Sequence, residues 1–222
     1  MKRVLAAAFL FSLLCFASAA HASPFTITAQ LTGDARQGNP DNIFLDITIN
    51  GDTNSNVTSW LVDLNSPLHP GASLHEFNFN LAGAFLDYSF DSFSPLSWAV
   101  AGGANAEGSG SADFVFQAAG PNNTVTNDDS LTFNANKLTG NFSVADFMSA
   151  ACSTGDLVLG CNQLGAHVGS LVAGRGESDS GFAVGNYSTD RQITAVPEPA
   201  SLLLLGSGLV AATSARRRKK AQ

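Results

Sequence analysis

Positive charge is scarce in the central part of this sequence of 222 residues. Residues 23–195 contain 17 acidic side chains and four basic ones, so their formal net charge is −13. The four basic residues are Arg36, Lys137, Arg175 and Arg191. A segment with this charge repels the phosphates of nucleic acids and the anionic surfaces of membranes. We therefore expect no nucleic-acid partner for it.

The signatures of common enzyme classes are also missing. The sequence has no Gly-x-Ser-x-Gly elbow and no Walker lysine, and Phe79 stands where a zinc-protease motif needs a second histidine after His75-Glu76. His69 and His75 flank a turn and are expected to be exposed. His167 is interpreted as a structural histidine at the start of a strand. We predict no catalytic residue and no metal site.

One set of carboxylates leaves an alternative open. If residues 84–93 form a strand, Asp87, Ser89 and Asp91 point to the same face. Two carboxylates on one face can serve as acid and base in glycoside hydrolysis. The solvated side of a sheet explains the same residues, and solubility alone accounts for them.

Calcium is the ligand that the acidic turns suggest. Residues 52–56 place side-chain oxygens at alternate positions, and Asp63 stands where an EF-hand has its last ligand. Val57, however, occupies the position that an EF-hand reserves for glycine, and the residues after it alternate as a strand does. A hairpin turn is therefore the preferred interpretation. We assign no residues to weak calcium binding, and we predict no cofactor.

What the sequence does contain is a period of two. Apolar residues alternate with polar ones, which buries one face of a strand and leaves the other in water. Such segments lie at residues 43–49, 77–81, 86–91, 114–116 and 131–133, with turn residues between them. They predict an all-β fold over residues 23–195, an antiparallel β-sandwich or jelly roll, with one short helix within 141–151.

The N-terminus has the three regions of a secretory signal peptide. Two cations precede an apolar run over residues 4–17, and small residues lead up to Ala22. The run is shorter than the roughly 20 residues that a membrane-spanning helix needs. We predict export through the Sec translocon and removal of residues 1–22 by signal peptidase, with cleavage between Ala22 and Ser23.

The C-terminus has three parts as well. Val196, Pro197, Glu198 and Pro199 precede an apolar segment over residues 200–215, and the five cations Arg216, Arg217, Arg218, Lys219 and Lys220 follow it. As a helix the apolar segment would be roughly 24 Å long, and snorkelling cations help such a helix to cover a bilayer core. The cations stay on the cytoplasmic side, and the prolines keep the preceding backbone extended and open to a protease. These features predict a C-terminal transmembrane helix that anchors the protein transiently in the inner membrane.

This tail over residues 196–222 resembles the PEP-CTERM sorting signal, which is found on proteins of Gram-negative bacteria that make exopolysaccharide. The resemblance implies recognition by exosortase, a membrane-embedded enzyme similar to cysteine transpeptidases, and loss of the tail. It also implies a final place at the cell surface or in the extracellular matrix. An ordinary membrane anchor that is never cut is the alternative.

Cysteine is rare, and its use agrees with export. Cys15 lies in the predicted signal peptide, so Cys152 and Cys161 are the two that remain. Two cysteines outside the cytoplasm are expected to form one disulfide, which would stabilise the fold by about 2–3 kcal/mol. Metal binding by this pair would need further ligands that are not nearby.

Three hypotheses for the domain follow. The first is a non-enzymatic protein of the envelope or of a biofilm matrix, with exopolysaccharide as a partner. The second is a carbohydrate-binding β-sandwich in which Trp60 or Trp98 stacks on a sugar, although core packing also explains both tryptophans. The third is a hydrolase that acts on polysaccharide through Asp87 and Asp91. The missing catalytic motifs favour the first.

Overall fold

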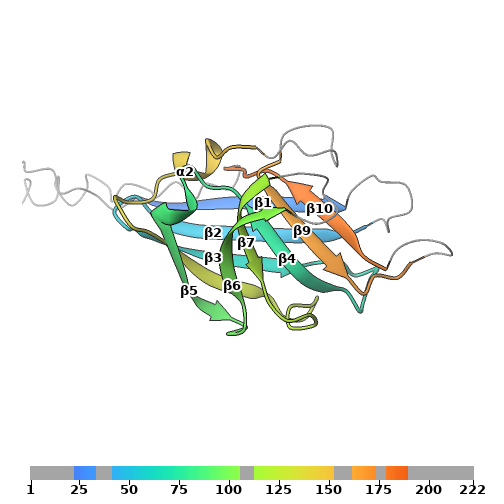
Figure 1. The fold of residues 1–222 in the computed structure, drawn as a ribbon. Helices are drawn as coiled ribbons and strands as arrows, with labels where there is room; N and C mark the ends of the chain where they lie inside the picture. The colour runs from blue at the N-terminus through green and yellow to red at the C-terminus, as the bar shows by residue number, and fades with distance from the viewer. Residues whose placement is uncertain (1–22, 34–41, 106–112, 153–161, 174–178, 190–222) are drawn as a thin grey trace, which may run out of the picture. The chain divides into compact units, whose positions relative to one another are not determined.

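In the computed structural model of the chain, residues 23–33, 42–105, 113–152, 162–173 and 179–189 are described, and the structural statements concern them alone. They contain ten strands and two short helical elements (Figure 1). The strands are β1 (Pro24–Gly33), β2 (Phe44–Asp52), β3 (Val57–Leu64), β4 (Ser73–Phe79), β5 (Tyr88–Ser94), β6 (Ala99–Asn105), β7 (Asp113–Ala119), β8 (Leu131–Lys137), β9 (Leu164–Gly169) and β10 (Gly181–Gly185). The helical elements are the 3-10 helix η1 (Phe85–Asp87) and the α-helix α2 (Ala145–Met148).

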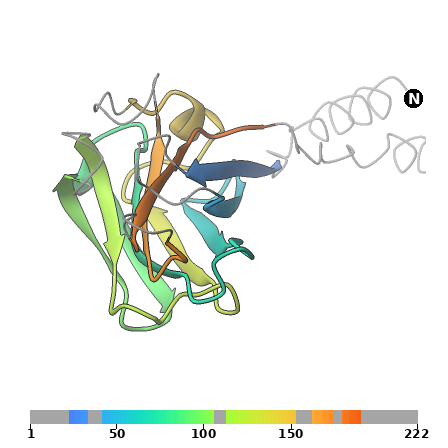
Figure 2. The same cartoon turned by 90° about the vertical axis from the view of Figure 1, so that its right-hand side faces the viewer.

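All ten strands pair antiparallel in one sheet, in the order β5-β8-β3-β2-β1-β10-β9-β4-β7-β6. The sheet folds over, so that β1, β2 and β3 of the first half lie opposite β4, β6 and β7 of the second half (Figure 1, Figure 2). The halves join where β1 pairs with β10 at Thr32 and Gly33, and again at a bridge between Thr28 and Ser188. The prediction of an all-β antiparallel fold is confirmed.

The predicted alternation is clearest in β2. Leu45, Ile47 and Ile49 are buried, whereas Asp46 and Thr48 between them are partly exposed. β1 repeats the pattern, although its alternation is not among the segments predicted to be strands. Burying one face of each strand places a continuous apolar layer between the two halves of the sheet.

Aromatic rings fill this layer. The ring of Trp60 in β3 contacts Phe77 and Phe79 in β4, with centroid distances of 6.3 and 4.9 Å. These contacts connect the two halves of the sheet, because β3 and β4 belong to different halves. Aromatic pairs at such distances stabilise a core beyond the area that they bury.

The two outermost strands, β5 and β6, end the sheet on opposite sides of a narrow opening. Phe85 of η1 lies against Gly102 of β6, where an added Cβ would come within 2.6 Å of the phenyl ring. Glycine is therefore required for this close approach. The ring therefore packs against a face of β6, and contact between β5 and β6 leaves the sheet nearly closed.

The predicted strand over residues 84–93 begins later than expected. In η1, the carboxylate of Asp87 accepts a hydrogen bond of 2.7 Å from the backbone N–H of Ala84. This local bond favours a turn over an extended chain. β5 then starts at Tyr88, which is buried and donates its hydroxyl hydrogen to the carbonyl of Ala82.

The alternation over residues 77–81 also predicts more exposed side chains than the structure shows. Phe77 and Phe79 are buried as expected, but Asn78 and Asn80 on the other positions are buried too. Asn80 has hydrogen-bond partners on both sides, because its amide donates to Ala151 O at 2.8 Å and accepts from the backbone N–H of Val115 at 2.7 Å. The chain around β4 is therefore covered on both faces, which a period of two does not reveal.

Two further predictions concern helices. The short helix expected within 141–151 is confirmed as α2, which buries Phe147. None of the helices in the described part of the chain has the length and the apolar character that a membrane span requires. The predicted membrane segment at 200–215 lies outside the described residues.

Candidate functional site

A polar surface covers the outward side of β1, β2, β3, β8 and β5. We call it the polar face; its side chains are Thr26, Thr28, Gln30, Thr32, Asp46, Thr48, Asn50, Ser59, Leu61, Asp63, Thr132, Asn134, Asn136, Ser89 and Asp91. Leu61 is the one apolar member of this set, and two further apolar residues, Phe44 and Val57, lie on the same side as the cross-strand partners of Thr32 and Asn136. Cross-strand partners point to the same side of a sheet, so the register lines these residues up in rows across the five strands. One row runs Thr26, Asn50, Ser59, Asn134, Asp91.

Hydrogen bonds between neighbouring strands hold several of these side chains in place. Gln30 Nε2 donates to Asp46 Oδ1 at 3.0 Å, and Asn65 Nδ2 donates to Asp46 Oδ2 at 2.9 Å. Thr26 Oγ1 donates to Asn50 Oδ1 at 2.9 Å in the same way. Both oxygens of the Asp46 carboxylate are therefore oriented by amides on either side of it.

The polar face is hollowed where β1 and β2 meet the chain that follows β10. The hollow is an open groove of about 510 Å³. Its lining consists of Thr28, Ala29, Gln30, Asp46, Ile47, Thr48, Asn186 and Ser188. Ala29 and Ile47 turn their side chains into the core, so the groups that face the groove carry hydroxyl, amide and carboxylate functions. This volume lies within the range of small-ligand sites, whereas the polar lining is unusual for them.

The two candidate hydrolase carboxylates belong to different elements of the structure. Asp87 lies in η1 and is bound to Ala84, whereas Asp91 lies in β5. Hydrogen bonds from Ser92 and Asn136 lower the pKa of Asp91. A catalytic acid in glycoside hydrolysis needs a raised pKa, so the environment of Asp91 opposes that role.

The histidine predictions were partly wrong. His69 is buried rather than exposed, and its Nδ1 accepts the backbone N–H of Val172 at 3.1 Å. His75 is half-buried, and burial lowers its pKa while the carboxylate of Asp179 opposes this shift. His167 stands within β9 rather than at its start.

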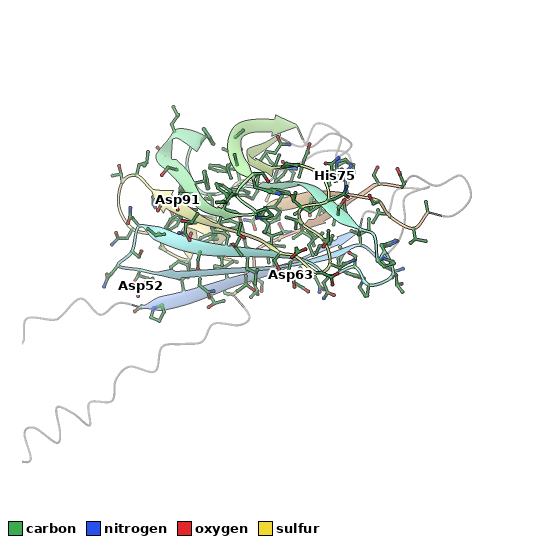
Figure 3. All side chains as sticks on the ribbon, turned by 90° about the horizontal axis from the view of Figure 1, so that it is seen from below. Asp52, Asp63, His75 and Asp91 are labelled. Atoms are coloured by element: carbon green, nitrogen blue, oxygen red, sulfur yellow. The ribbon has the colours of Figure 1, made fainter. Side chains whose placement is uncertain are left out.

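His75 and His167 lie close together on the outer side of β4 and β9. Their ring centroids are 5.1 Å apart, and His167 stacks on Phe182 at 4.5 Å. An added Cβ on Gly169 would come within 2.3 Å of the His75 ring, so glycine makes room for it. This arrangement is a packed aromatic cluster. Figure 3 shows His75 well apart from Asp52, Asp63 and Asp91.

The calcium-like segment folds as the hairpin between β2 and β3. The backbone N–H of Asn54 donates to Asp52 Oδ1 at 2.8 Å, as in a turn that an aspartate begins. Asp63 lies on β3, where Ser130 Oγ donates to its Oδ1 at 2.8 Å. Within the described ranges, no three His, Cys, Asp or Glu side chains are placed to hold a metal ion together.

Both tryptophans proposed to stack on sugar are core residues. Trp60 and Trp98 are each 2% exposed. Trp98 Nε1 donates to Thr124 Oγ1 at 2.7 Å, and Trp60 Nε1 donates to Thr58 Oγ1 at 3.1 Å. The prediction that either ring binds carbohydrate by stacking is wrong, because neither ring has a face open to solvent.

Several predicted sites lie outside the described residues. They are the signal segment 1–22 with Ala22, Cys161 of the expected disulfide with Cys152, the motif 196–199 and the basic cluster 216–220. The first described residue, Ser23, is the predicted mature start, and β1 begins directly after it. Signal cleavage and the disulfide stay predictions.

Comparison with known families decides the nature of the C-terminus. A family model described as the PEP-CTERM protein-sorting motif matches residues 195–219. The chain carries a PEP-CTERM sorting motif. The predicted resemblance is thereby confirmed, since the matched residues contain the proline pair, the apolar segment and most of the basic cluster. No curated protein and no solved structure matches the chain significantly.

The PEP-CTERM motif defines the route of the protein. It marks the chain as an exported protein targeted to an exosortase, which is its processing partner. It also implies transient anchoring in the membrane at the C-terminus. The motif matches 25 residues at the end of the chain and leaves the β domain outside the match.

Sequence reasoning missed the polar groove. One signal was available, because Thr26, Thr28 and Gln30 alternate with buried residues as a strand requires. The contribution of Asn186 and Ser188 had no such signal. They reach the groove only because the chain after β10 returns to β1.

Proposed function

We propose that this chain is a non-enzymatic structural protein of the envelope or biofilm matrix of a Gram-negative, exopolysaccharide-producing bacterium. Signal peptidase would release it after Ala22, and exosortase would remove its tail. The observation that carries this proposal is the PEP-CTERM motif at residues 195–219. The motif follows an all-β domain that presents a broad polar face.

The chemistry of the β domain supports a non-enzymatic role. The carboxylates that could act as an acid and base pair lie in different elements, and the pKa of Asp91 is lowered. The histidines pack as a cluster or accept a backbone hydrogen bond. These groups are satisfied by structural contacts, whereas a catalytic site needs titratable groups that converge on a substrate.

The decisive experiment is the mass of the C-terminal peptide of the protein recovered from the surface and the medium of its native host. Loss of the residues after 196–199 is the expected result. A variant with Gln in place of all five cations over 216–220 should remain unprocessed, and Arg175→Gln serves as the matched control outside the tail. An intact basic cluster on the wild-type surface protein would mean a permanent anchor and would overturn the proposal.

The non-enzymatic part is tested separately. Incubation of the full chain with the host polysaccharide should release no reducing ends. Release that is abolished in Asp91→Asn, but not in Asp63→Asn on the same face, would show a hydrolase instead.

A further inference from the structure

We propose that the groove between β1, β2 and residues 186–188 binds sugar units of an uncharged polysaccharide. This inference rests on the proposed function, since it names the partner of the β domain in the matrix. It replaces stacking on tryptophan, which the buried positions of Trp60 and Trp98 exclude, with hydrogen bonding along a polar sheet.

The groove offers the groups that sugar hydroxyls require. Six polar residues line it: Thr28, Gln30, Asp46, Thr48, Asn186 and Ser188. Hydroxyls both donate and accept, amides provide both functions and a carboxylate accepts. A polyhydroxylated ligand can therefore replace water at these groups, whereas an apolar ligand would leave the hydroxyls of Thr28 and Thr48 without partners.

The hydroxyls of Thr28 and Thr48 are available to bind a ligand. Thr28 and Thr48 are direct cross-strand partners, so their side chains lie next to each other on the polar face. Neither hydroxyl has a hydrogen-bond partner among the residues that the structure describes. β-branched side chains on a strand lose little freedom on binding, because they hold few rotamers there.

The carboxylate of Asp46 is the hydrogen-bond acceptor beside these two hydroxyls, and its orientation is held before a ligand binds. Gln30 and Asn65 hold the Asp46 carboxylate from both sides, at 3.0 and 2.9 Å. Both amides come from the same half of the sheet as Asp46 or from the turn after β3. A preorganised acceptor binds a sugar hydroxyl at a lower entropic cost than a mobile one.

The negative charge of the groove favours an uncharged polysaccharide over an anionic one. Among the described residues that line the groove, Asp46 is the one charged side chain. Lys137 is the single cation among the described residues, and its Nζ is bound to Asp146 Oδ1 at 2.7 Å. An anionic polysaccharide would therefore meet repulsion from Asp46, and no described residue supplies a free cation to compensate it.

The polar face extends beyond the groove, so a longer polysaccharide can continue along it. The row that starts at Thr28 and Thr48 runs on through Leu61 to Thr132 and Ser94. Binding by hydrogen bonds that replace water is weak at each site. Several protein copies along one polysaccharide would raise the overall affinity.

The test is affinity gel electrophoresis of the full chain in a polyoxyethylene detergent, which has no sugar headgroup to compete. The gels contain dextran, a β-1,3-glucan, mannan or galactomannan as uncharged probes, alginate as an anionic probe and chitosan as a cationic one. Thr28→Val/Thr48→Val removes the two hydroxyls with little change of shape. Thr139→Val is the control, because it makes the same change at an exposed threonine in the turn after β8, outside both the groove and the polar face.

Retardation by at least one uncharged probe is the expected result. The double variant should weaken that binding about tenfold or more, and the control should not. Absence of retardation by all four uncharged probes, or equal retardation of the double variant and the wild type, would overturn the inference. Retardation by chitosan alone, with loss in Asp46→Asn, would show a site for cations instead.

A second readout separates this inference from the proposed function. The C-terminal peptide and the cell fraction of the double variant are determined in the host. A processed variant in the surface fraction that no longer binds the probe supports both proposals. A wild-type chain that is processed but does not bind any uncharged probe refutes the groove alone.

Discussion

The indole of Trp60 stacks on the ring of Phe133, with 5.2 Å between the centroids and 20° between the planes. The two residues are direct partners in the ladder between β3 and β8. Trp60 also reaches Phe79 in the other half of the sheet. The tryptophan that the sequence offered as a sugar platform therefore connects the halves of the core.

Replacing Trp60 should be among the most damaging single changes. We expect Trp60→Ala to lower the free energy of unfolding by about 3–5 kcal/mol, because it leaves a cavity among several rings. Urea unfolding followed by circular dichroism measures this loss. Leu61→Ala at the next position, 39% exposed on the polar face, should cost about 1 kcal/mol or less. Equal losses for both variants would contradict the assigned register.

Both tryptophans of the chain should be shielded from a charged quencher. Trp60 and Trp98 are its two tryptophans, each 2% exposed. Iodide should therefore quench the fluorescence of the native protein weakly. After unfolding in guanidinium chloride, quenching should reach the level of a free indole. Strong quenching in the native state would place one ring on the surface.

Alkaline pH should destabilise the fold before its tyrosines ionise. The chain has two tyrosines, and burial raises the pKa of Tyr88 from 10.0 to about 12 and that of Tyr187 well above 10.0. Between these values the unfolded chain loses protons that the folded chain retains. Stability is therefore unaffected by these groups below pH 10 and decreases as the pH rises from there.

Absorbance of tyrosinate near 295 nm measures the ionisation of the two tyrosines directly. At pH 10.5 to 11 the native protein should show little tyrosinate, and the signal should rise together with unfolding. In Tyr88→Phe, the part of the signal due to Tyr88 disappears while Tyr187 remains protonated in the fold. Half-ionisation of the native protein near pH 10 would show that the tyrosines are exposed.

Asp146 connects the end of β8 to α2. Its Oδ1 accepts from Lys137 Nζ at 2.7 Å, and its Oδ2 accepts from the backbone N–H of Ser143 at 2.8 Å. Asp146 is 7% exposed, so Asp146→Ala should cost about 2–4 kcal/mol by leaving Lys137 without its ion-pair partner. The double variant Lys137→Met/Asp146→Leu should lose less than Asp146→Ala does. If the two losses are equal, the buried ion pair is not the cause.

The predicted disulfide can be tested by thiol counting. Without reductant, the processed protein should contain no thiol that reacts with iodoacetamide, and with reductant it should contain two. Cys152→Ser/Cys161→Ser should lower the free energy of unfolding by about 2–3 kcal/mol. Reductant should destabilise the wild type by the same amount and leave the double variant unchanged. Two reactive thiols in the native protein would rule the bond out.

The fold class was predictable because exposed and buried residues alternate locally. Ile47 and Ile49 lie in the core, and Asp46 and Thr48 lie on the polar face, as a period of two requires. Prediction failed where a strand is covered on both sides, as at Asn78, or where a side chain bonds locally, as Asp87 does with Ala84.

The sequence alone specified the delivery route of this protein. A sorting motif is read as a contiguous stretch of chain, so the residues at 195–219 carry the information in their order. The groove was decided by tertiary structure only. Thr28 and Thr48 meet through strand register, and Ser188 joins them because the chain after β10 pairs back onto β1. Contacts between residues so far apart depend on how the whole sheet closes, which no local pattern encodes.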